Sequence, residues 1–216
     1  MELLNGTLSW YRARQSDGSG CTGSSEPTHG ARLPRRPTES GRGAEGDWIN
    51  GPLMPPLWSR CEQLKVPMTL LEPATRLPDI TCLIDRYPDL TVVIDHMADT
   101  PLDQPQQLQS LLQLARYPNV YVKISHLWSL SKQAYPYADS FSMLKMIYDA
   151  FGARRLIWGT DHPVCLPHVS YGLAVALYRD YLDFMPAADR KEIWHGTVQR
   201  IWPFGIWTAI RPVLRL

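Results

Sequence analysis

The stretch "SFSMLKMIYDAFGARRLIWGTDH" (140–162) contains a helical pattern, a glycine and an apolar run that leads into polar residues. Phe141, Leu144 and Ile147 recur at the spacing of one helix face, and Gly152 is a typical helix end. Residues 155–159 then form a short apolar run, which predicts a buried strand. A helix that leads into a buried strand is half of a parallel α/β unit.

The same unit recurs along most of the chain. Apolar residues at helical spacing predict helices over 56–65, 79–88, 105–118, 140–152, 171–182 and 188–202. Short apolar or β-branched runs predict strands over 66–71, 90–94, 120–124 and 155–159. This alternation predicts an α/β fold in which helices flank a parallel sheet.

Residues 11–47 have a different composition. They hold seven of the fourteen glycines and six arginines without a lysine, and they contain few apolar residues. Such a segment buries too little surface to offset its ordering entropy, which indicates loop or disorder. A basic nucleic-acid-binding arm is disfavoured because acidic residues are interleaved and no aromatic platform is present. We therefore divide the chain into a glycine- and arginine-rich segment (1–46), a globular part (47–204) and a tail (205–216).

The overall composition narrows the partners. A chain of 216 residues with a formal net charge of +1 offers no clustered basic footprint for nucleic acid or a membrane surface. No apolar run reaches the roughly 18 residues of a membrane span. The four cysteines form no CxxC pair, which favours a reducing cytoplasm over a secreted disulfide scaffold. We expect a small-molecule substrate.

Polar residues follow the last three predicted strands. Because the carboxyl ends of parallel strands meet at one edge, their side chains should converge there. A carboxylate at such a site can bind a divalent metal or take a proton from water, and a neutral imidazole can ligate a metal. The pairs are Asp95 with His96, Ser125 with His126, and Asp161 with His162, which Thr160 precedes.

Each of these residues also has a structural interpretation. A strand-end aspartate often caps the next helix, and His96 could be hydrogen-bonded within a core. Alternation along 120–124 places Lys123 on the face opposite the outer helices, where it needs an acid or a ligand, and Asp95 is an available partner. No ligand spacing distinguishes the remaining histidines, which we assign to structural or loop roles: His126, His162, His168 and His195.

Five segments together resemble the amidohydrolase-related family, the type 2 branch of the superfamily of metal-dependent TIM-barrel hydrolases. The resemblance implies a (β/α)8 barrel that holds a divalent metal, zinc or manganese. It implies that Asp161 on the last strand binds metal or shuttles a proton, and that His96 on the sixth strand faces the active site. The segments are "DLTVVIDHMAD" (89–99), "YPNVYVKISHL" (117–127), "YPYAD" (135–139), "FGARRLIWGTDHPV" (151–164) and "WHGTVQRIWPF" (194–204).

The chain departs from the family pattern at two places. It contains no HxH pair, with which the family's metal site usually begins, and no histidine ends the strand at 66–71. Glu72 is the nearest candidate there, and we assign Glu72 and Lys123 to substrate binding. The four predicted strands align with strands five to eight, and "GARLP" (30–34) is a candidate remnant of the fourth. A full barrel needs about 250 residues, so we expect an incomplete TIM barrel.

Three functions follow from this resemblance. The first is metal-assisted hydrolysis of a small cyclic ester, lactone or amide, with Asp161 and His96 at the centre; the missing HxH leaves open whether this chain is active. The second is a non-catalytic remnant that dimerises, because a half-barrel exposes its inner face and its sheet edges. The third is non-oxidative decarboxylation at the same site, which the family also includes.

Overall fold

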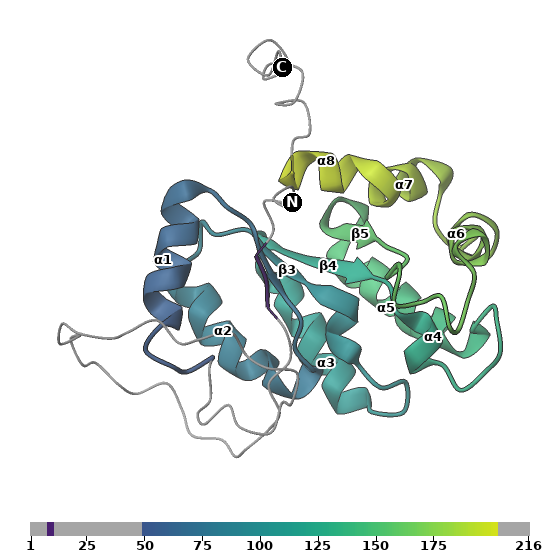
Figure 1. Ribbon diagram of the computed structural model, residues 1–216, viewed down its shortest axis with the longest axis horizontal. Helices are drawn as coiled ribbons and strands as arrows, with labels where there is room; N and C mark the ends of the chain where they lie inside the picture. The colour runs from purple at the N-terminus through teal and green to yellow at the C-terminus, as the bar shows by residue number, and fades with distance from the viewer. Residues whose placement is uncertain (1–7, 11–48, 203–216) are drawn as a thin grey trace, which may run out of the picture.

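The computed structural model describes residues 8–10 and 49–202. In these ranges, five strands form one parallel sheet in chain order (Figure 1). All four predicted strands are confirmed. The fifth strand was not predicted and lies within the glycine- and arginine-rich segment, whereas the predicted strand over 30–34 lies outside the described residues. The strands are β1 (Leu8–Trp10), β2 (Met68–Leu70), β3 (Val92–Ile94), β4 (Val120–Ile124) and β5 (Leu156–Trp158).

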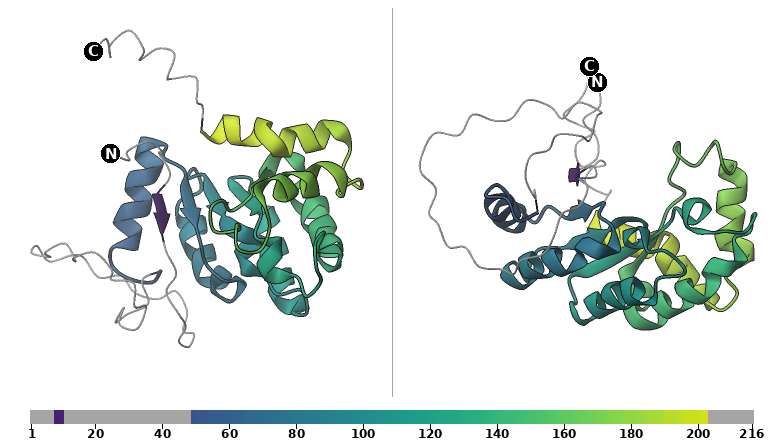
Figure 2. Two further views of the ribbon diagram at one scale, coloured as in Figure 1. Left: turned by 45° about the vertical axis from the view of Figure 1, so that its right-hand side comes forward. Right: turned by 90° about the horizontal axis from the view of Figure 1, so that it is seen from below.

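The helices occur where apolar periodicity predicts them, except for one short helix at Leu127–Leu130 that was not predicted. Four long helices cover one face of the sheet, and the last three lie beside the edge strand β5 (Figure 2). The predicted helix over 188–202 is divided by a π-helical turn, Glu192–Gly196. The helices are α1 (Met54–Leu64), α2 (Leu77–Arg86), α3 (Pro105–Gln113), α4 (Leu127–Leu130), α5 (Phe141–Phe151), α6 (Tyr171–Asp180), α7 (Ala187–Lys191) and α8 (Thr197–Ile201). Short 3-10 turns span Ala74–Arg76, Asp95–Asp99, Leu114–Arg116, Ala138–Ser140 and Ala153–Arg155.

Strand β4 shows why the sheet has two different faces. Val120, Val122 and Ile124 are buried beneath the helices, whereas Tyr121 and Lys123 are only partly buried. This alternation, which the sequence predicted, places the main hydrophobic core between the sheet and the outer helices. Lys123 therefore points to the inner face, where the polar strand ends also lie.

The inner face is partly covered at its apolar positions. Register places Val93 beside Tyr121 and Ile157 beside Lys123, so both belong to this face. Val93 and Ile157 are nevertheless buried, and they form a cluster with Ile201 at the end of α8. The expectation of an uncovered inner face is thus wrong at these two positions. Within the described ranges, no helix is both long enough and apolar enough to cross a membrane.

Helix α6, which follows the loop after β5, has a side-chain cap. Ser170 Oγ accepts a hydrogen bond from the Leu173 backbone N–H at 3.3 Å. We expect Ser170→Ala to lower the free energy of unfolding by about 1 kcal/mol, because one helix-end donor loses its partner. Ser170→Asp, which keeps an acceptor, should preserve stability. Urea denaturation measures both variants, and equal midpoints for the alanine variant and the parent would show that the cap contributes nothing.

Candidate functional site

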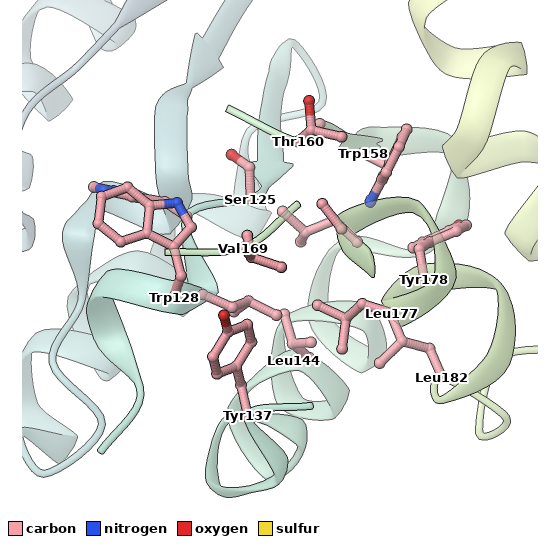
Figure 3. A pocket seen from close by; sticks show the side chains of 15 residues that line it. Ser125, Trp128, Tyr137, Leu144, Trp158, Thr160, Val169, Leu177, Tyr178 and Leu182 are labelled. Atoms are coloured by element: carbon pink, nitrogen blue, oxygen red, sulfur yellow. The ribbon is translucent and has the colours of Figure 1, made fainter. Parts of the chain in front are cut away.

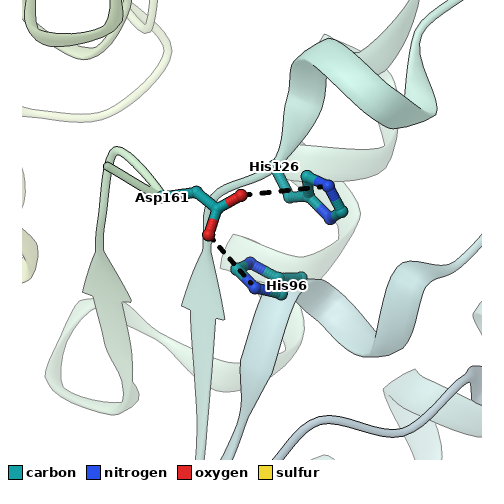
Figure 4. Close-up of side chains that lie close together, drawn as sticks. All are labelled: His96, His126 and Asp161. Carbon is teal, nitrogen blue, oxygen red and sulfur yellow. Dashed lines mark ion pairs between the residues drawn. The ribbon is translucent and has the colours of Figure 1, made fainter. Parts of the chain in front are cut away.

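Three side chains converge at the carboxyl ends of β3, β4 and β5 (Figure 4). His96 follows β3, His126 follows β4, and Asp161 follows β5 after a short connection. Each offers one possible ligand atom, and these atoms all lie within 4.8 Å of one another. The structure thus brings together the two residues that the sequence placed at the centre, His96 and Asp161. It adds His126, which the sequence analysis assigned to a structural or loop role and did not place beside these two residues.

The backbone at all three residues is left-handed. The φ angles are 48° at His96, 68° at His126 and 61° at Asp161. For a residue other than glycine this conformation costs roughly 1–2 kcal/mol, and such strain collects at functional sites. In the turn after β3, Met97 and Ala98 also have a left-handed backbone. Both residues are fully buried, and their packing holds the turn in place. The turn makes His96 project toward the neighbouring strand ends.

Each imidazole is held through its Nδ1 atom. His96 Nδ1 lies 2.8 Å from Ser125 Oγ, and His126 Nδ1 lies 2.9 Å from Asp99 Oδ1. A carboxylate oxygen only accepts hydrogen bonds, so Nδ1 of His126 carries the proton and donates it to Asp99. In both rings Nε2 is the atom that faces Asp161.

The Nε2 atoms stand slightly apart from the Asp161 carboxylate. His96 Nε2 lies 3.6 Å from Oδ1, and His126 Nε2 lies 3.9 Å from Oδ2. Both distances exceed those of a hydrogen bond. Ligands of one tetrahedral zinc, at bond lengths of about 2.1 Å, lie about 3.4 Å apart. Donor atoms that lie up to 4.8 Å from one another must therefore move closer together to share one divalent cation, and their types are those that zinc binds.

Burial affects the charge of His96. The ring is nearly buried, and burial lowers its pKa below the ordinary value of histidine. The charge of Asp95 opposes this shift more strongly than that of Asp161 does, while His126 and Lys123 add to it. A lowered pKa favours the neutral imidazole, which is the form that binds metals.

The other two predicted site residues lie around this group. Lys123 pairs with the buried carboxylate of Asp95, which is the structural alternative considered for it. Gly159 lies beside the lysine, since a Cβ there would come within 3.4 Å of Lys123 Cδ. Glu72 is buried two residues beyond β2 and is not part of the His96, His126 and Asp161 group. The substrate-binding roles of Lys123 and Glu72 stay predictions.

The three remaining histidines of the described residues lie outside the group. His162 is exposed and packs against Tyr171, while His168 stacks on Trp128 with ring centroids 4.0 Å apart. His195 lies in the π-helical turn before α8. A signal for His126 was present in the sequence, because "SH" ends its strand just as "DH" ends the strand before it.

An apolar cavity adjoins the site on the helix side of the sheet (Figure 3). Its volume is about 30 Å³, which suits a water molecule and is far below the several hundred Å³ of a small-molecule pocket. The labelled lining side chains are Ser125, Trp128, Tyr137, Leu144, Trp158, Thr160, Val169, Leu177, Tyr178 and Leu182.

Comparison with known proteins identifies relatives of this arrangement. The chain is 34% identical over 127 residues to an L-fucono-1,5-lactonase of Burkholderia ambifaria, and 33% identical over 99 residues to one of Burkholderia multivorans. The matches cover 56% and 43% of this chain, but 43% and 33% of those proteins. The chain therefore spans less than half the length of the curated relatives that it matches.

A solved structure shows the same fold. An amidohydrolase from Burkholderia multivorans with bound zinc superposes with a TM-score of 0.64 and 26% sequence identity. The match covers 72% of this chain and 59% of that protein. The four predicted strands and their flanking helices thus correspond to part of a TIM-barrel amidohydrolase, as the sequence predicted. A family model described as amidohydrolase matches residues 28–204, and the chain belongs to the amidohydrolase family.

Proposed function

We propose that this protein catalyses the metal-assisted hydrolysis of a small lactone or related cyclic ester. The observation that carries the proposal is the convergence of His96 and Asp161 at the strand ends, with an imidazole-and-carboxylate donor set that fits a divalent metal. Two relatives named as lactonases support the ester class. A zinc-containing structure of the family supports the metal. We propose zinc or manganese as the metal.

The chemistry divides between the metal and the residues around it. When bound, a divalent metal polarises a carbonyl and makes water a better nucleophile near neutral pH. Asp161 is the proposed ligand and base, because its two carboxylate oxygens face different imidazoles and one can accept a proton from water. His96 presents Nε2 to the same space while Ser125 fixes its orientation. Proton transfer by a positioned carboxylate typically contributes about 10²- to 10⁴-fold to the rate.

We propose that the substrate approaches over the inner face. Lys123 lies on that face and pairs with Asp95, which precedes His96, so its ammonium group is a candidate to bind a polyhydroxylated or carboxylated ring. Glu72 follows a neighbouring strand, where it could accept hydrogen bonds from substrate hydroxyls.

A turnover assay tests the proposal. The chain is stripped with a chelator, reloaded with zinc or manganese, and assayed against L-fucono-1,5-lactone, other sugar 1,5-lactones, a cyclic amide and a hydroxybenzoate. We expect metal-dependent hydrolysis of at least one lactone and no release of carbon dioxide. Carbon dioxide from the hydroxybenzoate would favour the decarboxylase instead. A metal-loaded chain without turnover, together with a stable dimer in solution, would favour the non-catalytic remnant.

A further inference from the structure

We propose that His126 is a third metal ligand, positioned by Asp99, so that the ends of β3, β4 and β5 form a metal site without an HxH pair. The inference rests on the proposed function for the presence of a divalent metal, and it adds the composition of the site. The family resemblance assigns His126 no role.

The hydrogen bond to Asp99 sets the tautomer of His126. Because Nδ1 carries the shared proton, Nε2 of the neutral ring keeps its lone pair and points toward Asp161. A carboxylate behind a histidine is the usual support of a metal-binding imidazole, since it fixes the ring and raises its basicity. His96 has the same arrangement with the Ser125 hydroxyl in place of the carboxylate.

The distances show that His126 is held through Nδ1 and is not hydrogen-bonded to Asp161 through Nε2. His126 Nδ1 makes a hydrogen bond of 2.9 Å to Asp99, but its Nε2 stays 3.9 Å from Asp161. A charge-assisted hydrogen bond to Asp161 would bring nitrogen and oxygen to about 2.8 Å. His96 Nε2 is likewise 3.6 Å from Asp161, beyond hydrogen-bond distance. Both Nε2 atoms therefore lie beyond hydrogen-bond distance of one carboxylate, and we propose that a cation binds between them.

The His126 ring also contacts two other aromatic rings. Its centroid lies 4.6 Å from the ring of His96 and 4.4 Å from that of Trp128, which meets it edge-on. Trp128 is in turn stacked on His168. A side chain that is already packed against two rings loses little rotamer freedom when it binds a metal. The orientation of the His126 ring is therefore set by these contacts before a metal binds.

This donor set determines the chemistry that the site allows. Two imidazoles and one carboxylate are the three protein ligands of several catalytic zinc and iron sites, which keep positions open for water and substrate. Asp161 completes the set from β5, and all three ligands come from neighbouring strands of one sheet. The absence of HxH then changes which residues bind the metal but does not remove the site.

Metal binding by the full chain tests this inference without an activity assay. Cobalt(II) and zinc are titrated into the chelator-stripped protein, with calorimetry for affinity and visible absorption for cobalt coordination. The variants are His126→Asn, Asp99→Asn and, as a matched control, His162→Asn. Asparagine tolerates the left-handed backbone of His126, which protects the fold. Circular dichroism checks that each variant is folded.

We expect the parent and His162→Asn to bind about one equivalent of metal with the same cobalt spectrum. Asp99→Asn should weaken binding about 10- to 100-fold, the usual effect of losing a ligand's support. His126→Asn should weaken it further and change the cobalt spectrum. If His126→Asn does not fold, Asp99→Asn alone carries the test.

Three outcomes are decisive. Parent-like affinity and cobalt spectrum in His126→Asn, or in Asp99→Asn if only that variant folds, would overturn the inference and leave the proposed function intact. A parent chain that binds no metal would overturn both. Metal binding that depends on His126, in a protein that turns over no lactone, would support the inference and contradict the proposed function.

Discussion

Asp161→Asn should reduce metal-dependent lactone hydrolysis by at least about 100-fold in kcat/KM, because one residue serves as ligand and as base. The substitution keeps the size of the side chain and removes its charge. Asparagine also accepts the left-handed backbone found at this position, where φ is 61°. The loss should therefore come from chemistry and not from unfolding. Steady-state kinetics at saturating metal measures it.

The neighbouring His162 provides the control for this prediction. It is exposed and lies outside the metal group. His162→Asn should therefore retain the kinetics of the parent, although it changes the residue next to Asp161 in the same loop. Metal affinity measured on Asp161→Asn separates its two proposed roles. Unchanged turnover with metal still bound would exclude Asp161 as the base.

The sequence predicted the sheet because its strands are buried on both faces or alternate strictly. Strand β4 shows the alternation, and β5 shows the short apolar run. Strand β1 escaped prediction because its sequence, LSW, is not part of a longer apolar run and because the adjoining composition indicates loop. The π-helical turn at Glu192–Gly196 was not predicted for another reason. It changes the backbone hydrogen bonds but not the apolar spacing from which helices are predicted.

The site could be predicted only in part. Strand ends identified where His96 and Asp161 lie, because parallel strands bring their carboxyl ends to one edge. His126 also follows a strand, but its proposed role depends on the orientation of its ring and on a hydrogen bond to Asp99 from a turn 27 residues away. Spacing in the chain carries no information about either feature. The alternation of β4 did predict the direction of Lys123, and Asp95 is the partner that the structural alternative named for it.

Lys123→Met should destabilise the protein by about 2–3 kcal/mol, because it leaves the Asp95 carboxylate buried without its cation. Methionine has a similar length and fills the same space beside Gly159. Removing one partner of a buried ion pair costs about 3–5 kcal/mol, and the lower value here allows for a lysine side chain that is 29% exposed. Asp95 itself is only 7% exposed, so water cannot replace the lysine fully.

Two further variants show whether the lost ion pair is the cause. Adding Asp95→Asn to Lys123→Met removes the buried charge, so the double variant should recover much of the lost stability. Lys132→Met removes a lysine from an exposed pair with Asp103, where both side chains are more than half exposed. That control should leave the urea midpoint nearly unchanged. A double variant as unstable as Lys123→Met would instead show that the lysine stabilises the protein through packing. It would also show that the buried Asp95 carboxylate tolerates the loss of its partner.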